Sequence, residues 1–328
     1  FLVIIIKFLK YILKIKPLQN RILNMLNKIK NRLFKNKNNV HILIDKLKKV
    51  RSLNTCLVLY GSPTEGNWKG ISIATKNLYP DNSIEIPQWY SNPVLSEKES
   101  LVLINKIKEL NFEKVIISGF ANYFFDWIDS LSKALKIEVI YHGTISEFHE
   151  IYSRSQIQKI VNYSQINKIH SIGFVQKGLA EVFNKLYTIQ TYHQPLPVPL
   201  FPEGIKKIKV DESKINIGVF GANTFNKNLH NQVIHALLID NTLIHVLDKS
   251  IFKYLNLDER IVEHGKNLPY SEFLSILSSM DLNLYMSYNE SWGLIAFESE
   301  ALGINSLTFP NLDYLELIQE KITQNKGN

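Results

Sequence analysis

The sequence predicts an α/β protein built from two halves, each with a parallel sheet covered by helices. From residue 55 onward, short apolar runs alternate with segments of helical periodicity. Four prolines at positions 195, 197, 199 and 202 interrupt this alternation and exclude a helix there. The alternation resumes at residue 215. A chain of 328 residues is long enough for about two domains.

The first half is predicted from its apolar runs and the helical patterns that follow them. The runs typical of buried strands are 55–61, 114–119, 137–143 and 169–174. The helical patterns cover 70–80, 123–136 and 175–186. Because helices recur between the strands, the order favours parallel strands joined by crossover helices.

The second half repeats the pattern. Its predicted strands are 215–221, 242–248, 281–287 and 304–309. Its predicted helices are 227–239, 270–280 and a third that begins at Leu294. Ligands of open α/β sheets bind beyond the carboxyl ends of the strands, so we expect functional residues in the loops that follow these strands.

The helix predicted from Leu294 contains an unexpected carboxylate. Leu294, Phe297 and Ala301 fall at i, i+3 and i+7, which is the face that packs. Glu298 lies inside that stripe, whereas Glu300 points elsewhere. A buried ionised carboxylate is costly unless other groups donate hydrogen bonds to it. The sequence therefore predicts hydrogen-bond donors around Glu298, from the protein or from a ligand.

Positive charge is concentrated at the N-terminus. Residues 1–51 hold 14 of the 38 lysines and arginines and one acid, a net charge of +13, whereas residues 52–328 carry −5. A nucleic-acid surface spread over the body is therefore not expected. After Pro17, basic and apolar side chains occupy opposite helical faces, which suits an anionic membrane surface. The alternatives are a helix packed on the body, the tail of a membrane span and a signal remnant.

Cys56 is the only cysteine, so no intrachain disulfide can form. This is typical of a reducing compartment. Together with the basic segment, it predicts a cytoplasmic protein attached peripherally to the inner face of the membrane.

Residues 289–303 read NESWGLIAFESEALG and carry a recognisable motif. Two glutamates, Glu290 and Glu298, stand eight positions apart, with Trp-Gly-Leu between them and Ala-Leu-Gly after them. This pattern resembles the donor-binding segment of the family-four, retaining glycosyltransferases of the GT-B fold. The resemblance is strong over 213–318 and weaker over 55–200.

The resemblance implies two Rossmann-like domains that face each other across a cleft. An acceptor-side domain would cover 52–200 and a linker 201–212. A nucleotide-sugar-binding domain would cover 213–328, with the basic segment 1–51 outside both. Family members continue with a further strand and C-terminal helices, so the second domain is expected to be truncated here.

The resemblance also assigns roles to the motif. In the family the second glutamate, here Glu298, accepts hydrogen bonds from the ribose hydroxyls, and the first, Glu290, meets the hydroxyls of the donor sugar. The helix beginning near Gly293 would point its N-terminus at the diphosphate, and Trp292 and Leu294 would complete the donor-binding segment. The alternative is structural, with Glu298 paired to a lysine and Glu290 capping a helix.

The sequence NIGVFGANTFNKN resembles the first strand and phosphate loop of the same domain. The family usually has an arginine directly after the glycine and a lysine five residues later. Here Gly221 is followed by Ala222, and Lys227 is in register. One cation therefore remains against the charge of the leaving diphosphate. Asn223 offers hydrogen bonds but no charge. The alternative for Lys227 is an ordinary solvated lysine.

In the first half, His142 follows a predicted strand directly. The family often has a histidine here, beneath the donor sugar, which implies a catalytic or acceptor-positioning role. The loop 61–70 follows the first strand. The family has a Gly-containing loop here, near the donor phosphates and the acceptor, so the resemblance implies that Gly66 and Gly70 let these groups approach closely.

The resemblance implies transfer of a hexose, with retention, from a UDP- or GDP-linked sugar to a glycan or lipid-linked acceptor. Cell-surface polysaccharide or glycolipid synthesis is the expected setting. No cofactor and no metal are expected, and the sequence has no DxD triplet.

Two other functions compete with this one. A catalytically degenerate partner or binding subunit of the same fold is favoured by Ala222 and by the expected truncation. A glycan phosphorylase, with pyridoxal phosphate bound to a lysine, is less favoured because the chain is too short.

Overall fold

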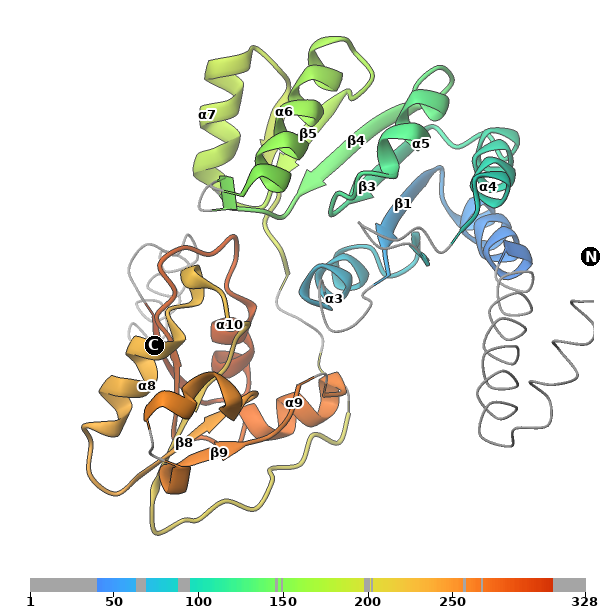
Figure 1. The fold of residues 1–328 in the computed structure, drawn as a ribbon. Coiled ribbons are helices and arrows are strands. Elements are labelled where there is room, and N and C mark those ends of the chain that lie inside the picture. Colours follow the sequence, from blue (N-terminus) through green and yellow to red (C-terminus); the bar gives the residue numbers. More distant parts are fainter. Residues whose placement is uncertain are drawn as a thin grey trace, which may run out of the picture.

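Two open parallel sheets organise the protein, one in each half (Figure 1). A computed structural model describes residues 40–62, 69–87, 95–144, 147–148, 150–197, 201, 203–255, 258–266 and 268–308. The first sheet has the strand order β2-β1-β3-β4-β5-β6 and the second has β11-β10-β7-β8-β9. The neighbouring strands pair in parallel throughout. The prediction of two α/β halves is confirmed.

The first domain follows the predicted order with some additions. Its strands are β1 (Cys56–Gly61), β2 (Ser83–Ile86), β3 (Lys114–Ser118), β4 (Lys136–Tyr141), β5 (Ser171–Phe174) and β6 (Thr191–His193). Its labelled helices are α3 (Lys69–Leu78), α4 (Glu97–Glu109), α5 (Phe124–Leu131), α6 (Ile151–Gln165) and α7 (Lys177–Tyr187). Residues 40–53 are also helical.

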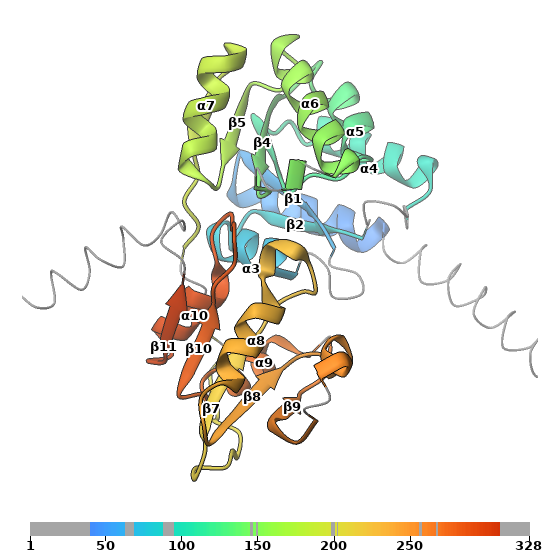
Figure 2. The ribbon, with the colours of Figure 1, turned by 60° about the vertical axis from the view of Figure 1, so that its left-hand side comes forward.

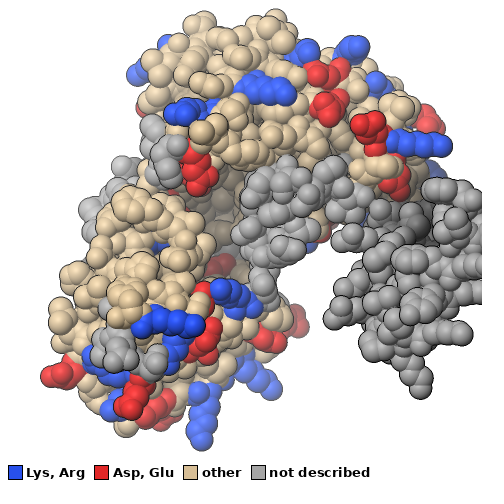
Figure 3. Space-filling view, in the orientation of Figure 1, with Lys and Arg blue, Asp and Glu red and all other residues tan. Residues whose placement is uncertain are grey.

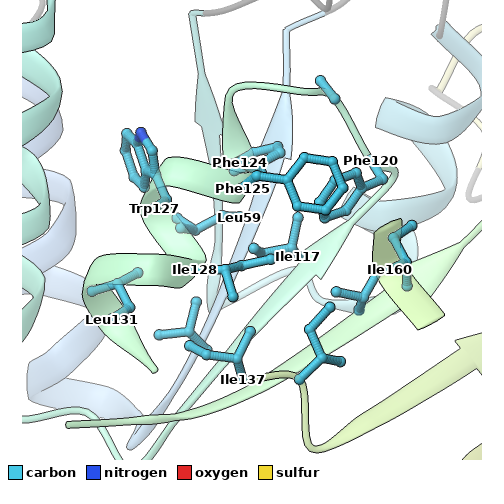
Figure 4. Close-up of a cluster of buried hydrophobic side chains, with 14 of the residues drawn as sticks. Leu59, Ile117, Phe120, Phe124, Phe125, Trp127, Ile128, Leu131, Ile137 and Ile160 are labelled. Carbon is cyan, nitrogen blue, oxygen red and sulfur yellow. The ribbon is translucent and has the colours of Figure 1, made fainter. Parts of the chain in front are cut away.

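One face of the first sheet carries the largest apolar core. Side chains of β1, β3 and β4 pack there against α4 to α7 and the helix at 40–53. Phe124, Phe125 and Trp127 of α5 are almost fully buried, and Figure 4 shows them above Leu59 and Ile117 of the sheet. The other face is covered by α3, which lies on the side of the second domain (Figure 2).

The helix predicted at 123–136 is shorter than expected. It ends at Leu131, and Lys136 already pairs with Lys114 as the first residue of β4. The chain has to turn within residues 132–135 to return to the sheet, so tertiary pairing overrides the helical pattern there.

Two features lie across the predicted domain boundaries. The boundary after residue 51 falls inside the helix at 40–53, whose Val40, Leu43, Leu47 and Val50 lie in the first core. The predicted linker 201–212 packs along the second domain, where its apolar residues join the cluster around α9.

The second domain has the predicted elements together with the short strand β9 at one edge of its sheet. Its strands are β7 (Ile215–Val219), β8 (Thr242–Val246), β9 (Ile261–Glu263), β10 (Leu282–Tyr285) and β11 (Asn305–Thr308). Its α-helices are α8 (Leu229–Leu237), α9 (Tyr270–Leu277) and α10 (Leu294–Ala301). Short 3₁₀ segments are η2 (Phe225–Lys227), η3 (Lys249–Leu255) and η4 (Asp258–Arg260).

The two faces of the second sheet have separate apolar clusters. Side chains of β7 and β8 pack against α8 on one face. On the other, α9 packs with the segment 201–210 and Phe220. Within the described part of the chain, no helix combines the length and apolar character needed to cross a membrane.

Candidate active site

The site lies where the two domains meet, around the start of α10. One apolar cluster draws residues from both domains. The first domain contributes Val58, Ala74, Ile116, Ile140, Val175 and Leu196, and the second contributes Tyr285, Trp292, Ala296 and Phe297. A Cβ added to Gly70, at the start of α3, would lie 3.2 Å from Cδ1 of Leu294. The N-terminal ends of α3 and α10 are therefore in close contact.

Lys227 and Glu290 form a salt bridge at the carboxyl ends of β7 and β10. Lys227 Nζ lies 2.5 Å from Oε1 of Glu290 and donates to the hydroxyl of Tyr285 at 3.3 Å. Glu290 is only 7% exposed. The lysine side chain is itself mostly covered, so the pair sits below the surface rather than in bulk solvent.

A buried glutamine fixes the spacing of the two loops that carry this pair. The side-chain amide of Gln232, on α8, donates to the backbone carbonyl of Lys227 at 2.7 Å. Its carbonyl oxygen accepts from the backbone N–H of Met286 at 3.0 Å. The backbone N–H of Tyr288 also donates to the carbonyl of Asn226 at 2.8 Å. These bonds join two loops that are distant in the sequence.

Glu298 is buried in α10, and among the residues that the structure describes one side chain, that of Tyr270, donates a hydrogen bond to it. Glu298 is 3% exposed, and Oε1 accepts a hydrogen bond from the hydroxyl of Tyr270 at 2.7 Å. Burial raises the pKa of Glu298 to about 7, and the bond from Tyr270 acts in the opposite direction. Glu298 is thus the desolvated carboxylate that the sequence pattern required.

The backbone at the start of α10 has a conformation that suits the close approach of an anionic group. Gly293 is its N-cap, with φ of +82°, and no described side chain caps the helix. Positive φ favours glycine, and uncapped N–H groups at a helix N-terminus favour anions. Beside it, the buried ring of Trp292 stacks on Phe297, with centroids 5.1 Å apart. Glu290 therefore pairs with Lys227 and does not cap this helix.

His142 follows β4 and is held by a chain of hydroxyl groups. Its Nε2 lies 3.0 Å from Oγ of Ser118, which lies 2.7 Å from the hydroxyl of Thr75 on α3. Thr75 in turn donates to the carbonyl of Ile71. Burial lowers the pKa of His142 to about 4. The imidazole is therefore neutral at physiological pH and offers a hydrogen bond rather than a charge.

Glu147, in the loop after β4, is a further carboxylate on this side. Burial raises its pKa, the charge of Lys227 lowers it, and Glu150 and Glu290 raise it again. Lys227 and Glu290 belong to the second domain, so this loop lies within electrostatic reach of the salt bridge.

The other predicted residues that the structure describes lie in different surroundings. Gly221 lies beside Lys227, because a Cβ there would be 3.7 Å from the lysine Cβ. Asn223 is exposed. Gly66 lies outside the described residues. Ala301, predicted in the packing stripe of α10, is exposed because the short helix buries consecutive residues in its middle instead.

Sequence reasoning missed the residues that support the predicted ones. Tyr270 begins a helix and Gln232 lies mid-helix, where nothing in the local pattern separates them from ordinary surface positions. Tyr285 is the last residue of β10, and ligands of open α/β sheets bind beyond the carboxyl ends of strands, so its position in the sequence could have indicated it. Ser118 ends β3 in the same way and supports His142.

In the part of the chain that the structure describes, the arrangement combines one cation, a helix N-terminus without a side-chain cap, two buried carboxylates and a neutral histidine. It can hold an anionic group near Lys227 and α10 while the carboxylates accept hydrogen bonds from hydroxyl groups. Among the described residues, no group of three or more histidine, cysteine, aspartate and glutamate side chains is placed to hold a metal ion.

Comparison with known proteins gives matches to structures alone. No family model matches the chain, and no curated protein matches it. A structure of Alr3699/HepE from Anabaena, in complex with UDP and glucose, aligns with a TM-score of 0.54 and 12% identity over 79% of this chain and 82% of that one. WaaG, a glycosyltransferase involved in lipopolysaccharide biosynthesis, aligns at 0.51 with 15% identity over 81% and 83%.

A third structure is the sucrose-phosphate synthase of Thermosynechococcus elongatus, with a TM-score of 0.52 and 12% identity over 79% and 82%. At these identities the likeness concerns the fold. The two facing parallel-sheet domains and these neighbours together show that the chain has the GT-B fold.

Proposed function

We propose that the chain is a glycosyltransferase that moves a hexose from a nucleotide diphosphate sugar to a glycan or lipid-linked acceptor. The observation that carries this proposal is the placement of Lys227–Glu290 and Glu298 on either side of the start of α10. The likeness to a protein solved with UDP and glucose, and also with UDP-glucose, supports it.

In this proposal the diphosphate lies against Lys227 and the N–H groups at the start of α10. Glu298 accepts hydrogen bonds from the ribose hydroxyls, and Glu290 from those of the hexose. Lys227 offsets the charge that develops on the departing diphosphate. Neutral His142 offers a hydrogen bond to the sugar or the acceptor.

The proposed reaction retains the anomeric configuration. The bond from the anomeric carbon to the diphosphate oxygen breaks, and the acceptor hydroxyl bonds to that carbon on the same face. The hydroxyl proton passes to the departing diphosphate. Since we expect no metal to take part, transfer should persist in EDTA.

A catalytically degenerate subunit is the second candidate, and one observation favours it. Ala222 stands where a second cation is usual in the family, and Lys227 is already paired with Glu290. With its charge partly offset, a single lysine stabilises a leaving diphosphate less. Nucleotide binding without sugar transfer would identify this case.

The test is a panel of UDP, GDP and their hexose conjugates, measured by thermal shift, by calorimetric binding and by nucleotide release. We expect one nucleotide to bind and its sugar conjugate to be turned over. Glu298→Gln should weaken nucleotide binding about tenfold or more, because hydrogen bonds to charged groups contribute ~1.5–3 kcal/mol. Glu290→Gln should chiefly lower turnover.

The matched control is Glu300→Gln, on the same helix but exposed. It should leave both binding and turnover unchanged. The absence of binding by every nucleotide in the panel would overturn the proposed function.

A further inference from the structure

Tyr270 is the group that holds the buried carboxylate of Glu298, and the donor-site motif does not include it. It begins α9, 28 positions before Glu298 in the sequence. Its hydroxyl donates to Oε1 of Glu298 at 2.7 Å. Glu298 is 3% exposed, so water hardly competes for the carboxylate. Within the described part of the chain, this is the side-chain hydrogen bond that orients the carboxylate.

We propose that Tyr270 is a positioning residue of the nucleotide site, whose hydroxyl fixes one oxygen of Glu298 so that the carboxylate meets the ribose hydroxyls in a single orientation. The inference rests on the proposed function. A carboxylate offers about four lone-pair sites. Tyr270 occupies one of them, which leaves capacity for both ribose hydroxyls.

Tyr270 also favours the ionised form of Glu298, which accepts hydrogen bonds. Burial raises the pKa of this carboxyl group to about 7, and Tyr270 is the one described ionisable group whose interaction lowers it. On α10 itself, Glu300 is exposed, and at the start of α9 so is Glu272. A donated hydrogen bond stabilises the ionised carboxylate. Without it, more of Glu298 carries a proton at neutral pH.

The affinity for the nucleotide should depend on pH through the protonation of Glu298. The ionised carboxylate is the acceptor for the ribose, so nucleotide affinity should fall as pH drops through about 7. Removing the hydroxyl of Tyr270 raises the pKa of Glu298 further. The same fall should then occur at higher pH.

The experiment measures UDP affinity by calorimetry across about pH 5.5–8.5, or GDP affinity if the wild-type chain binds that nucleotide instead. Tyr270→Phe should weaken binding about tenfold at pH 7, as expected for a lost hydrogen bond to a charged group. It should also move the midpoint of the pH profile upward. Thermal unfolding checks that the variant is folded.

Three further variants show whether Tyr270 acts by positioning Glu298 or only supports the structure. Glu298→Gln should flatten the profile, and adding Tyr270→Phe to it should change nothing more. Tyr163→Phe is the matched control, because Tyr163 donates to a carboxylate oxygen of Asp129 at 3.0 Å in the first domain. It should leave the UDP profile as in the wild type.

Each result of the affinity measurements has a different consequence for the role of Tyr270. An unchanged profile in Tyr270→Phe makes the tyrosine a structural contact alone, and tighter binding makes it a competitor of the ribose. Either result overturns the inference while the proposed function stands. If the wild-type chain binds neither UDP nor GDP, the proposed function fails, and this inference fails with it.

Discussion

At the scale of single residues, the salt bridge between Lys227 and Glu290 sets the charge balance of the site. Both side chains are largely withdrawn from water. Such a pair is costly to break, because the remaining charge is left without a partner in a poorly solvated place. The surface pair of Lys168 and Asp129 is more exposed on both sides and serves as a comparison.

Lys227→Met should therefore destabilise the protein by about 3 kcal/mol, the lower end for a broken buried pair. Lys168→Met should cost less than about 1 kcal/mol. Adding Glu290→Gln to Lys227→Met should recover most of the loss, since no unpaired charge remains. Urea unfolding compares the three variants with the wild type. Equal costs for the two lysines would contradict the buried character of the first pair.

His142 gives the protein a stability that depends on pH. Burial lowers its pKa from 6.5 to about 4. Between these two pH values His142 is therefore protonated in the unfolded chain and neutral in the folded chain. The contribution of His142 to the free energy of unfolding is fully present above about pH 6.5 and is lost as the pH falls towards 4. Glu298, whose pKa is raised, contributes with the opposite sign. The difference between wild type and a His142 variant isolates the histidine.

Between pH 7 and pH 5 the wild type should lose about 2 kcal/mol more stability than His142→Gln. Glutamine keeps a partner for Ser118 but does not titrate. Urea unfolding at the two pH values checks this. Parallel losses in the two proteins would show that the histidine is protonated in the folded state.

At the scale of elements, the packing between β7 and β10 holds both halves of the site in register. Gly218 of β7 faces Asn283 of β10, and a Cβ there would lie 2.2 Å from Oδ1 of that asparagine. Asn283 cannot easily move, because its amide donates to the carbonyl of Leu277 and the hydroxyl of Ser299. Ser299 belongs to α10, so this contact joins sheet and helix.

Gly218→Ala should destabilise the protein by about 3 kcal/mol, as overpacking of a tight interior does. The control is Gly178→Ala in α7, where an added Cβ meets nothing within 4 Å. That change should leave stability unchanged or raise it by up to about 1 kcal/mol, because alanine favours the helix. Chemical denaturation distinguishes them. A tolerated Gly218→Ala would mean that β7 and β10 can separate at little cost.

At the scale of the whole molecule, charge is distributed unevenly along the chain. Residues 1–51 carry +13 and residues 52–328 carry −5. On the face shown in Figure 3, acidic and basic side chains of the described residues are interspersed over both domains. The concentrated basic charge belongs to the N-terminal segment, of which residues 1–39 lie outside the described part.

We propose that this segment attaches the protein to an anionic membrane surface, on the cytoplasmic face beside a lipid-linked acceptor. Each lysine or arginine near such a surface contributes about 1 kcal/mol. The chain should sediment with vesicles that contain phosphatidylserine and remain in solution with phosphatidylcholine alone. Salt should weaken the binding, since exposed charges are screened beyond about 8 Å at physiological ionic strength.

Deletion of residues 1–37 is the decisive comparison. It should abolish sedimentation with the anionic vesicles and leave nucleotide binding intact. If the shortened chain binds vesicles as well as the full one, the attachment does not reside in this segment.

The sequence by itself determined the two α/β halves and the position of Glu298 on a packing face. Periodicity is a local property, so strands such as β7 and helices such as α9 could be predicted from a few residues each. Ser96 and Glu99 have the spacing of a capping box, which is a local sequence signal for the start of α4, and the structure contains this capping box. The motif around Glu290 and Glu298 could be recognised because its residues are close together in the sequence.

Only the tertiary structure decided which side chains meet as hydrogen-bond and salt-bridge partners. Lys227 and Glu290 are 63 positions apart and meet because the sheet places β10 directly beside β7. Tyr270 reaches Glu298 because α9 lies against α10. The sequence pattern shows which side chains are buried, but strand order and helix packing decide which buried groups face each other. Hydrogen bonds and salt bridges act over a few ångströms, so their partners are fixed by that packing.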